Sequence, residues 1–162
     1  MNLPLIRWRH GAYFNPVQPP VTGLRGENVV WFINPEHHRG GMRLLFVCVG
    51  NTCRSQMAEA IARDMGHEAV SAGTRAPTGG RVAKKAIEVL MEIGIDASEQ
   101  YPKSVESVDT SGFDKIISMG CGVHCPTLSI DDDWGLEDPY GKDIEFYKQT
   151  LEEIKHRIGT LD

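Results

Sequence analysis

A thiol and a guanidinium are separated by five residues in the segment Cys48-Val49-Gly50-Asn51-Thr52-Cys53-Arg54-Ser55. The apolar run 44–47 before it predicts a strand that ends at Cys48, and the helical spacing after it predicts a helix that begins near Arg54. A loop between a strand and a helix N-terminus can direct several backbone N–H groups at one anion. The planar guanidinium of Arg54 can then bind two oxygens of the same anion.

We therefore predict an oxyanion-binding loop with Cys48 as its nucleophile. The loop amides and the helix dipole are expected to lower the pKa of the Cys48 thiol and favour the thiolate. Ser55 either donates a hydrogen bond to this sulfur or caps the helix. Asn51 is expected to stabilise the loop in a left-handed conformation, and Gly50 to permit close backbone approach. The predicted oxyanion-binding residues are Val49, Gly50, Asn51, Thr52, Cys53, Arg54 and Ser55.

Two alternatives to this interpretation stay open at this point. Cys48 could be a buried cysteine at the end of a strand, next to a solvated Arg54. Within the loop, Cys53 is either a spare thiol that protects Cys48 from over-oxidation or an inert filler residue.

Composition limits the classes of protein to which the chain can belong. With 162 residues, 41% of them hydrophobic, the chain can form one domain with a proper core. No apolar run approaches the roughly 20 residues of a membrane span, and a formal net charge of -5 argues against nucleic acid as a partner. Four cysteines are too few for a disulfide scaffold, and no secretory signal is evident, so we expect a cytoplasmic protein.

The first 41 residues differ from the remainder of the chain. They contain five of the nine prolines and no sustained hydrophobic period. We predict that 1–41 is an N-terminal extension, irregular or partly disordered, and that the compact domain spans 42–162 from Met42 onward.

From Met42 the hydrophobic pattern alternates between strands and helices. Strands are predicted at 43–48, 68–72 and 116–119, with a fourth at 128–131 whose acidic end fits less well. Helices are predicted at 54–65, 80–93 and 142–158, with a short one at 104–108. This alternation predicts an α/β domain with a parallel sheet and helices on both faces. Ligands of such sheets bind at the C-terminal ends of the strands, where Cys48 and Cys121 both lie.

An acid is needed to protonate the oxygen that leaves when a thiolate attacks a tetrahedral centre. Asp138 in the segment Asp138-Pro139-Tyr140-Gly141 is a candidate, because a turn of this composition can present a carboxyl group. The alternative is an ordinary turn in which Asp138 interacts with the dipole of the following helix.

The two remaining cysteines distinguish between reaction classes. A phosphatase needs one cysteine, whereas a reductase that returns electrons to a thiol pool needs two or three. Cys121 could attack an adduct on Cys48, and Cys125 could then displace it. Alternatively Cys121, Cys125 and His124 could hold zinc, although no second Cys/His pair is near to complete four ligands.

The segment 45–60 resembles the low-molecular-weight protein tyrosine phosphatase superfamily and, within it, the thiol-dependent arsenate reductases. Three further segments reinforce the resemblance: Ser71-Ala72-Gly73-Thr74, Met119-Gly120-Cys121 and Trp134-Gly135-Leu136-Glu137-Asp138-Pro139. Gln56, Thr52 and Gly141 are similar to the reductase branch, whereas Tyr140 is a phosphatase-like feature. Only three residues separate Cys121 from Cys125, whereas six separate these cysteines in the best-known thioredoxin-coupled reductases.

The resemblance implies a four-stranded parallel sheet flanked by helices in three layers, and a sequence of thiol reactions. Cys48 attacks arsenate, Arg54 binds its oxygens and Asp138 protonates the departing one. Cys121 then attacks the Cys48 adduct and releases arsenite, and Cys125 moves the disulfide to where thioredoxin or another thiol donor reduces it.

The resemblance also implies an optional potassium ion near Asn51, Glu59 and Ser71. We further expect no tightly bound cofactor and a monomeric protein. Two alternatives remain beside the reductase. The first is a phosphatase that hydrolyses phosphomonoesters through a phosphocysteine. The second is a non-enzymatic metalloid or zinc sensor that uses Cys121, Cys125 and Cys53.

Overall fold

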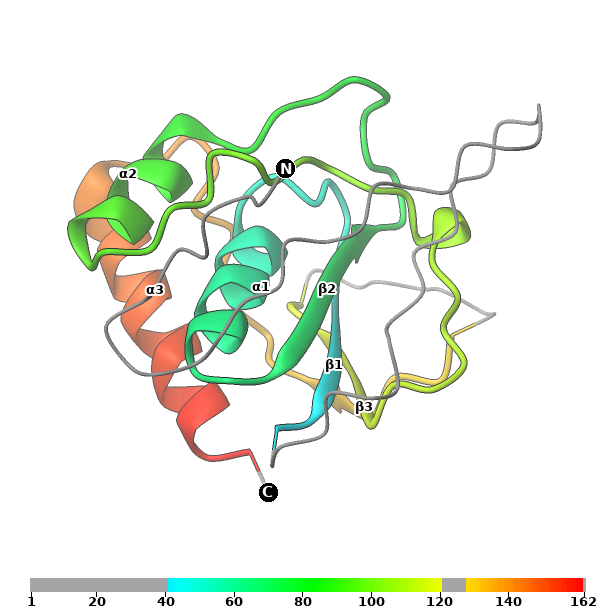
Figure 1. The fold of residues 1–162 in the computed structure, drawn as a ribbon. Helices are drawn as coiled ribbons and strands as arrows, with labels where there is room; N and C mark the ends of the chain where they lie inside the picture. The colour runs from blue at the N-terminus through cyan, green and yellow to red at the C-terminus, as the bar shows by residue number, and fades with distance from the viewer. Residues whose placement is uncertain (1–40, 121–127, 162) are drawn as a thin grey trace, which may run out of the picture.

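The computed structural model describes residues 41–120 and 128–161, which form a parallel sheet with helices packed against it (Figure 1). The strands are β1 (Arg43–Cys48), β2 (Glu68–Gly73), β3 (Lys115–Ser118) and β4 (Asp132–Asp133). The helices are α1 (Arg54–Asp64), α2 (Lys84–Glu92) and α3 (Ile144–Gly159), with a 3-10 helix, η2, at Val105–Ser107. No helix in this part of the chain has both the length and the apolar character needed to cross a bilayer.

The sheet has the strand order β2-β1-β3-β4, and all neighbouring strands are parallel. Cys48 at the end of β1 is paired with Gly73 at the end of β2, and Val47 is paired with Ser118 at the end of β3. The C-terminal ends of three strands therefore meet at one edge of the sheet. The predicted four-stranded parallel sheet is confirmed.

The prediction for the fourth strand was wrong in its position. β4 consists of Asp132 and Asp133, both exposed, whereas the predicted strand was 128–131. Just before β4, Asp131 accepts a hydrogen bond from the backbone N–H of Ile116 at 2.7 Å. Leu128 and Ile130 only pack against the sheet from partly buried positions. An edge strand is held by backbone pairing and can expose acidic side chains, so an apolar run does not mark its position in the sequence.

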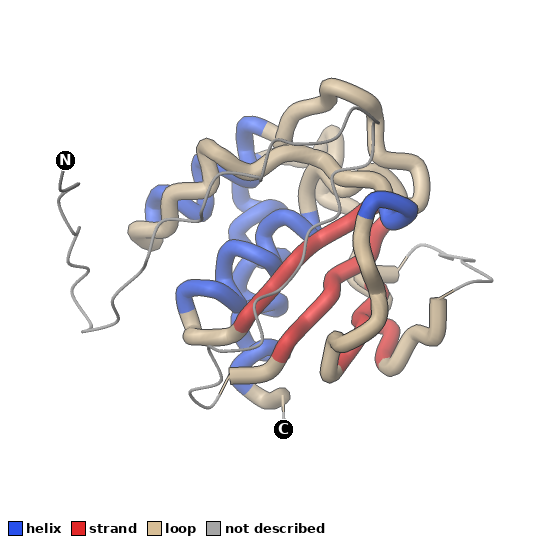
Figure 2. The backbone as a smooth tube through the Cα atoms, turned by 45° about the vertical axis from the view of Figure 1, so that its right-hand side comes forward, coloured by secondary structure: helices blue, strands red, loops and turns tan. Residues whose placement is uncertain are grey.

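The two faces of the sheet are covered differently. Alternate β1 side chains, such as Leu44 and Phe46, pack with α1, α2 and α3 in the larger hydrophobic core. Leu45 and Val47 point to the other face, where they pack with η2 and its neighbouring segments. Figure 2 shows the three α-helices on one side of the strands. Helices on both faces were expected, but in the described part the second face has only the single 3-10 turn of η2.

Helix α1 lies at the centre of the larger core and is buried from Arg54 to Ala62. Its sequence is rich in residues that favour helices, such as alanine and methionine. The helix stops before Gly66, which has a φ of +94°, and the N–H of His67 bonds back to the carbonyl of Ala62 at 2.9 Å. The glycine stop after this helix agrees with the ordinary preference for a left-handed residue there.

Helix α2 starts later than expected, at Lys84 instead of residue 80. Gly80 belongs to a turn closed by its bond to the carbonyl of Pro77, and Ala83 donates its backbone N–H to the carbonyl of Thr52 at 2.8 Å. The segment before α2 is thus tied to the loop that follows β1. Helix α3 buries one apolar stripe, made of Tyr147, Leu151, Ile154 and Ile158. Asp143 caps this helix by accepting from the N–H of Phe146 at 2.9 Å.

Candidate active site

The segment between β1 and α1 forms a tight loop at the C-terminal edge of the sheet. β1 ends at Cys48 and α1 begins at Arg54, as the sequence predicts. Asn51 has a φ of +52° and is the one non-glycine residue with positive φ among those described. Asparagine tolerates this left-handed conformation better than most residues, so the expectation for Asn51 is confirmed.

Cys48 is buried and hydrogen-bonded inside this loop. Its Sγ lies 2.9 Å from Ser55 Oγ and accepts a bond from the N–H of Asn51 at 3.1 Å. Burial raises the pKa of the Cys48 thiol. The bonds from Ser55 and Asn51 and the charge of Arg54 act in the opposite direction but are outweighed. The prediction of a lowered pKa is therefore wrong for this structure, because it did not account for the loss of solvation.

Ser55 is positioned to donate to Cys48. Its Oγ accepts a hydrogen bond from Asn51 Nδ2 at 2.8 Å, which leaves the hydroxyl hydrogen available for the sulfur. Helix α1 has Cys53 at its N-cap position and no side-chain cap. The first of the two roles considered for Ser55 thus fits the geometry, and the capping role does not.

The Asn51 side chain is itself held from two directions. Its Oδ1 accepts from the backbone N–H of Lys103 at 2.7 Å and from Gln56 Nε2 at 3.0 Å. Gln56 Nε2 also donates to the carbonyl oxygens of Asn51 and Tyr101, both at 2.9 Å. Asn51, Ser55 and Gln56 are completely buried. Since each polar group has a partner, this network stabilises one conformation of the loop.

Arg54 and Asp138 lie together although 84 positions separate them in the sequence. Arg54 Nη2 is 3.1 Å from Asp138 Oδ2, and Arg54 Nη1 donates to the carbonyl of Leu136 at 2.7 Å. The guanidinium is buried, whereas the Asp138 side chain is 55% exposed. Asp143, and not Asp138, caps α3. Asp138 is thus beside the loop and open to solvent, as a proton donor to a bound anion would need to be.

Cys53 has contacts that favour a packing role. Its Sγ lies 3.4 Å from the hydroxyl of Tyr147 in α3 and 3.7 Å from Thr52 Oγ1. Burial raises the pKa of the Cys53 thiol, and also that of Tyr147. A thiol with a raised pKa is less reactive at neutral pH. Of the two alternatives for Cys53, the inert one agrees better with these surroundings.

Three further residues of this site were given no role from the sequence. Gly73 stood only within the segment 71–74 of the family resemblance, and in the structure a Cβ there would lie 2.7 Å from the carbonyl oxygen of Val49 and 2.9 Å from Asn51 Cβ. Tyr147 could be recognised only as part of an apolar stripe, and Lys103 had no signal at all. Gly50, by contrast, is not required by packing, because a Cβ would meet only Thr52 Oγ1 at 3.6 Å.

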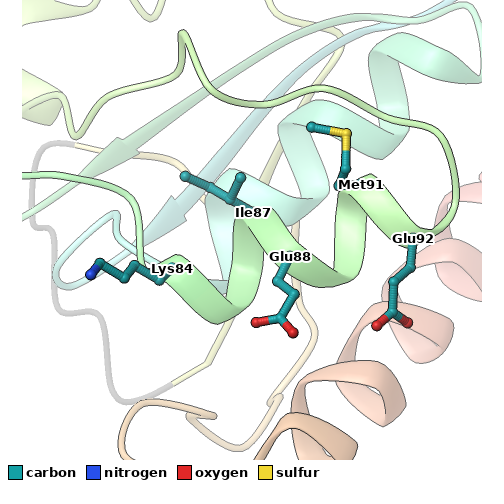
Figure 3. Close-up of a pocket in the computed structure, with 5 residues that line it drawn as sticks. All are labelled: Lys84, Ile87, Glu88, Met91 and Glu92. Carbon is teal, nitrogen blue, oxygen red and sulfur yellow. The ribbon is translucent and has the colours of Figure 1, made fainter.

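Some predicted site residues lie outside the described residues. These are Cys121 and Cys125, together with His124 of the zinc alternative. Within the described ranges, no three His, Cys, Asp or Glu side chains are grouped to hold a metal ion. A surface pocket along α2 contains no residue of the loop; Figure 3 shows its lining residues, Lys84, Ile87, Glu88, Met91 and Glu92.

Comparison with known proteins agrees with this fold. An arsenate reductase solved in the phosphate-binding state superimposes with a TM-score of 0.66 at 36% identity, over 73% of this chain and 94% of that one. The low molecular weight protein tyrosine phosphatase from T. tengcongensis gives a TM-score of 0.59 at 38% identity, over 74% of this chain and 96% of that one.

Curated relatives extend the comparison. The glutaredoxin arsenate reductase of Synechocystis sp. is 36% identical over 74% of this chain and 95% of its own length. An arsenate reductase of Staphylococcus aureus is 34% identical over 71% of this chain and 92% of its own length. The family model described as low molecular weight phosphotyrosine protein phosphatase matches residues 43–162. This chain belongs to the low molecular weight phosphotyrosine protein phosphatase family.

Proposed function

We propose that this chain is an arsenate reductase in which Cys48 is the nucleophile. The observation that carries the proposal is the buried loop in which Cys48 Sγ accepts from Asn51 and Ser55 while Arg54 pairs with Asp138. Such a site suits a tetrahedral oxyanion, which both arsenate and phosphate are. The names of the relatives in Synechocystis and Staphylococcus aureus favour arsenate.

In the first proposed step, the Cys48 thiolate attacks arsenic and forms a sulfur–arsenic bond. The loop amides of 49–54 and the Arg54 guanidinium stabilise the charge on the arsenate oxygens. Asp138 gives a proton to the departing oxygen, which leaves as water. Arsenic is still pentavalent at this stage. Because burial raises the pKa of the Cys48 thiol, we expect its proton to pass to an oxygen of the bound arsenate dianion as the thiolate forms.

In the second proposed step, the Cys121 thiolate attacks Cys48 Sγ. A Cys48–Cys121 disulfide forms, and the electron pair of the broken sulfur–arsenic bond reduces arsenic to the trivalent state, so arsenite leaves. Cys125 then attacks Cys121, which releases the Cys48 thiolate and leaves a Cys121–Cys125 disulfide. Two thiols are oxidised for each arsenate reduced.

An external thiol donor must reduce that disulfide to complete the cycle. The family resemblance implies thioredoxin or a similar donor, and the name of the Synechocystis relative points to glutaredoxin as a second candidate. A cytoplasmic location and a monomeric state stay predictions.

The test is steady-state arsenate reduction with a thioredoxin system and, in parallel, with glutathione and glutaredoxin. We expect arsenate-dependent consumption of electrons that is lost in Cys125→Ser. Single-turnover release of arsenite should persist in that variant, because Cys48 and Cys121 remain. Continued multiple turnover in both Cys121→Ser and Cys125→Ser would contradict the three-cysteine sequence.

Phosphatase activity is the second candidate function. The solved relatives include a tyrosine phosphatase and an arginine phosphatase from Geobacillus stearothermophilus, the latter 29% identical. Tyr140, beside Asp138, is 72% exposed and could contact an organic leaving group. Hydrolysis of para-nitrophenyl phosphate measured on the same sample distinguishes the two. Fast ester hydrolysis without arsenate turnover would favour the phosphatase.

A further inference from the structure

A buried cation, the ammonium group of Lys103, lies close to the Cys48 loop without touching Cys48. Lys103 Nζ is 3.3 Å from Glu59 Oε2 and 3.2 Å from the carbonyl oxygen of Tyr101. The side chains of Lys103 and Glu59 are 8% and 2% exposed. Neither residue contacts Cys48, and the proposed reaction does not use them. A charged pair this deeply buried has a large desolvation cost and calls for an explanation.

This pair lies where the family resemblance implies potassium, near Asn51, Glu59 and Ser71. Potassium needs oxygen atoms with free lone pairs, as hard cations do. Glu59 Oε2 already accepts from the backbone N–H of Ser71 at 2.8 Å, from the Ser71 hydroxyl and from Lys103 Nζ. Asn51 Oδ1 is engaged by the Lys103 N–H and by Gln56. The residues present therefore do not fit a potassium ion.

We propose that the ammonium group of Lys103 is the built-in cation of this centre, and that the Cys48 loop is ordered without potassium. The ammonium and a monovalent metal ion carry the same charge, so either could neutralise Glu59. The covalently attached cation makes the loop independent of the ionic composition of its surroundings. This inference does not depend on whether the substrate is arsenate or a phosphate ester.

The position of Lys103 connects this cation to the nucleophile. Its backbone N–H bonds to Asn51 Oδ1, and its carbonyl accepts from the N–H of Gly73 at 2.7 Å. Asn51 in turn bonds to Ser55, whose hydroxyl contacts Cys48 Sγ. Lys103 is thus a positioning residue. Loss of its ammonium should disturb both the Glu59 centre and the loop.

Arg63 contributes to the same carboxylate from the solvent side. Its Nη2 is 2.7 Å from Glu59 Oε1, and its side chain is 52% exposed. The Glu59 carboxylate is 2% exposed, so water screens this pair only from the Arg63 side. Two cations therefore compensate Glu59, and Lys103, which is 8% exposed, is the buried one.

The test compares thermal melting in 100 mM potassium chloride and in 100 mM tetramethylammonium chloride, a cation too large for the centre. The wild-type protein should melt at the same temperature in both salts. If potassium were bound with a dissociation constant about one hundredth of its concentration, the melting temperature would rise by roughly 5–10 °C. Such a rise for the wild-type protein would overturn the proposal.

Two variants of Lys103 separate loss of charge from loss of volume. Lys103→Ala removes the charge and leaves space, so we expect it to melt roughly 10 °C lower in tetramethylammonium and to recover part of that loss in potassium. Lys103→Met removes the charge but fills the space, and should be destabilised in both salts. Lys155→Ala, at an exposed lysine of α3, is the matched control and should respond to neither salt.

A second readout follows the nucleophile. The rate at which iodoacetamide alkylates Cys48, measured by mass spectrometry of its peptide, should change in Lys103→Ala and return toward the wild-type rate in potassium. Equal melting and alkylation of Lys103→Ala and wild type in both salts would contradict the role of Lys103. If neither Lys103 variant folds, the melting temperatures of the wild-type protein in the two salts still decide. Equal temperatures support the proposal, and a higher temperature in potassium overturns it.

Discussion

At the scale of single residues, the reactivity of Cys48 depends on its burial, on its hydrogen bonds and on the charge of Arg54. Burial raises the pKa of its thiol, while the bonds from Ser55 and Asn51 and the charge of Arg54 lower it. The bound anion and the Cys48 thiolate both need hydrogen-bond donors of this loop. We therefore expect the geometry of these few bonds to control the rate at which Cys48 attacks the anion. Substitutions that remove one donor at a time can measure the contribution of each.

Ser55→Ala removes the hydroxyl that lies 2.9 Å from Cys48 Sγ. This bond lowers the pKa of Cys48, so its loss should raise the pKa further. The thiolate fraction at neutral pH then falls, by about tenfold for each unit of pKa. We expect slower alkylation of Cys48 at pH 7 and a pH profile displaced to higher pH. Ser111→Ala, at an exposed serine, is the control; an unchanged profile in Ser55→Ala would contradict the assigned role.

Asp138→Asn keeps the shape of the side chain but removes the carboxyl group that would donate a proton to the departing oxygen. If Asp138 is the general acid, turnover should fall roughly 10²- to 10⁴-fold, with little change in the melting temperature because the side chain is exposed. Glu137→Gln is the matched control, since Glu137 is the adjacent exposed acid and pairs with Lys142. If Glu137→Gln were the slower variant, the acid would have been assigned to the wrong residue.

At the scale of secondary-structure elements, the loop is fixed by the strands on which it rests. The backbone N–H groups of Thr74 and Arg75, just after β2, donate to the carbonyls of Cys48 and Val49 at 3.1 and 2.9 Å. Gly73, at the end of β2, lets Val49 approach this closely. The parallel register of β1 and β2 therefore determines the loop geometry as much as the loop sequence does.

Gly73→Ala would bring a Cβ to 2.7 Å from the Val49 carbonyl oxygen, a distance that requires the backbone to move. We expect a loss of roughly 1–3 kcal/mol in the free energy of unfolding and a larger relative loss of turnover, because the loop is displaced. Chemical denaturation and steady-state kinetics measure the two effects. Gly159→Ala should not destabilise, since its Cβ would meet only Met65 Cε at 3.6 Å and alanine favours helices.

At the scale of the whole molecule, one hydrophobic core unites the helices with the sheet, and it draws on residues from Met42 to Leu161. Met42 is tied in through its N–H, which donates to His67 Nδ1 at 3.1 Å, and through its carbonyl, which accepts from the N–H of Glu68 at 3.0 Å. The boundary of the domain at Met42 is still a prediction, because residues 1–40 lie outside the described part.

A chain that starts at Met42 should fold and retain its activity, because the residues that form this core and the Cys48 loop are all present. Circular dichroism and thermal melting, followed by the arsenate assay, would measure this. The full-length chain is the control. Loss of folding or of turnover in the shortened chain would mean that 1–41 belongs to the domain.

The sequence alone was sufficient for features that depend on neighbours along the chain. Each element around Cys48 could be predicted from its own segment. An apolar run marks the strand, an asparagine that tolerates a left-handed conformation marks the loop, and residues that favour helices mark the helix. The parallel sheet followed from the alternation of these elements. The exposed pair Asp132–Asp133 could not be predicted as a strand, because only its pairing with β3 defines it.

The tertiary structure decided whatever depends on residues that are distant in sequence. It brought Asp138 and the Leu136 carbonyl to Arg54, Tyr147 to Cys53, and Lys103 to Glu59. It also reversed the expected direction of the Cys48 pKa, because desolvation depends on all the atoms packed around a group. Local sequence determines which groups a loop contains, whereas burial and partners supplied by other elements determine their charge and reactivity.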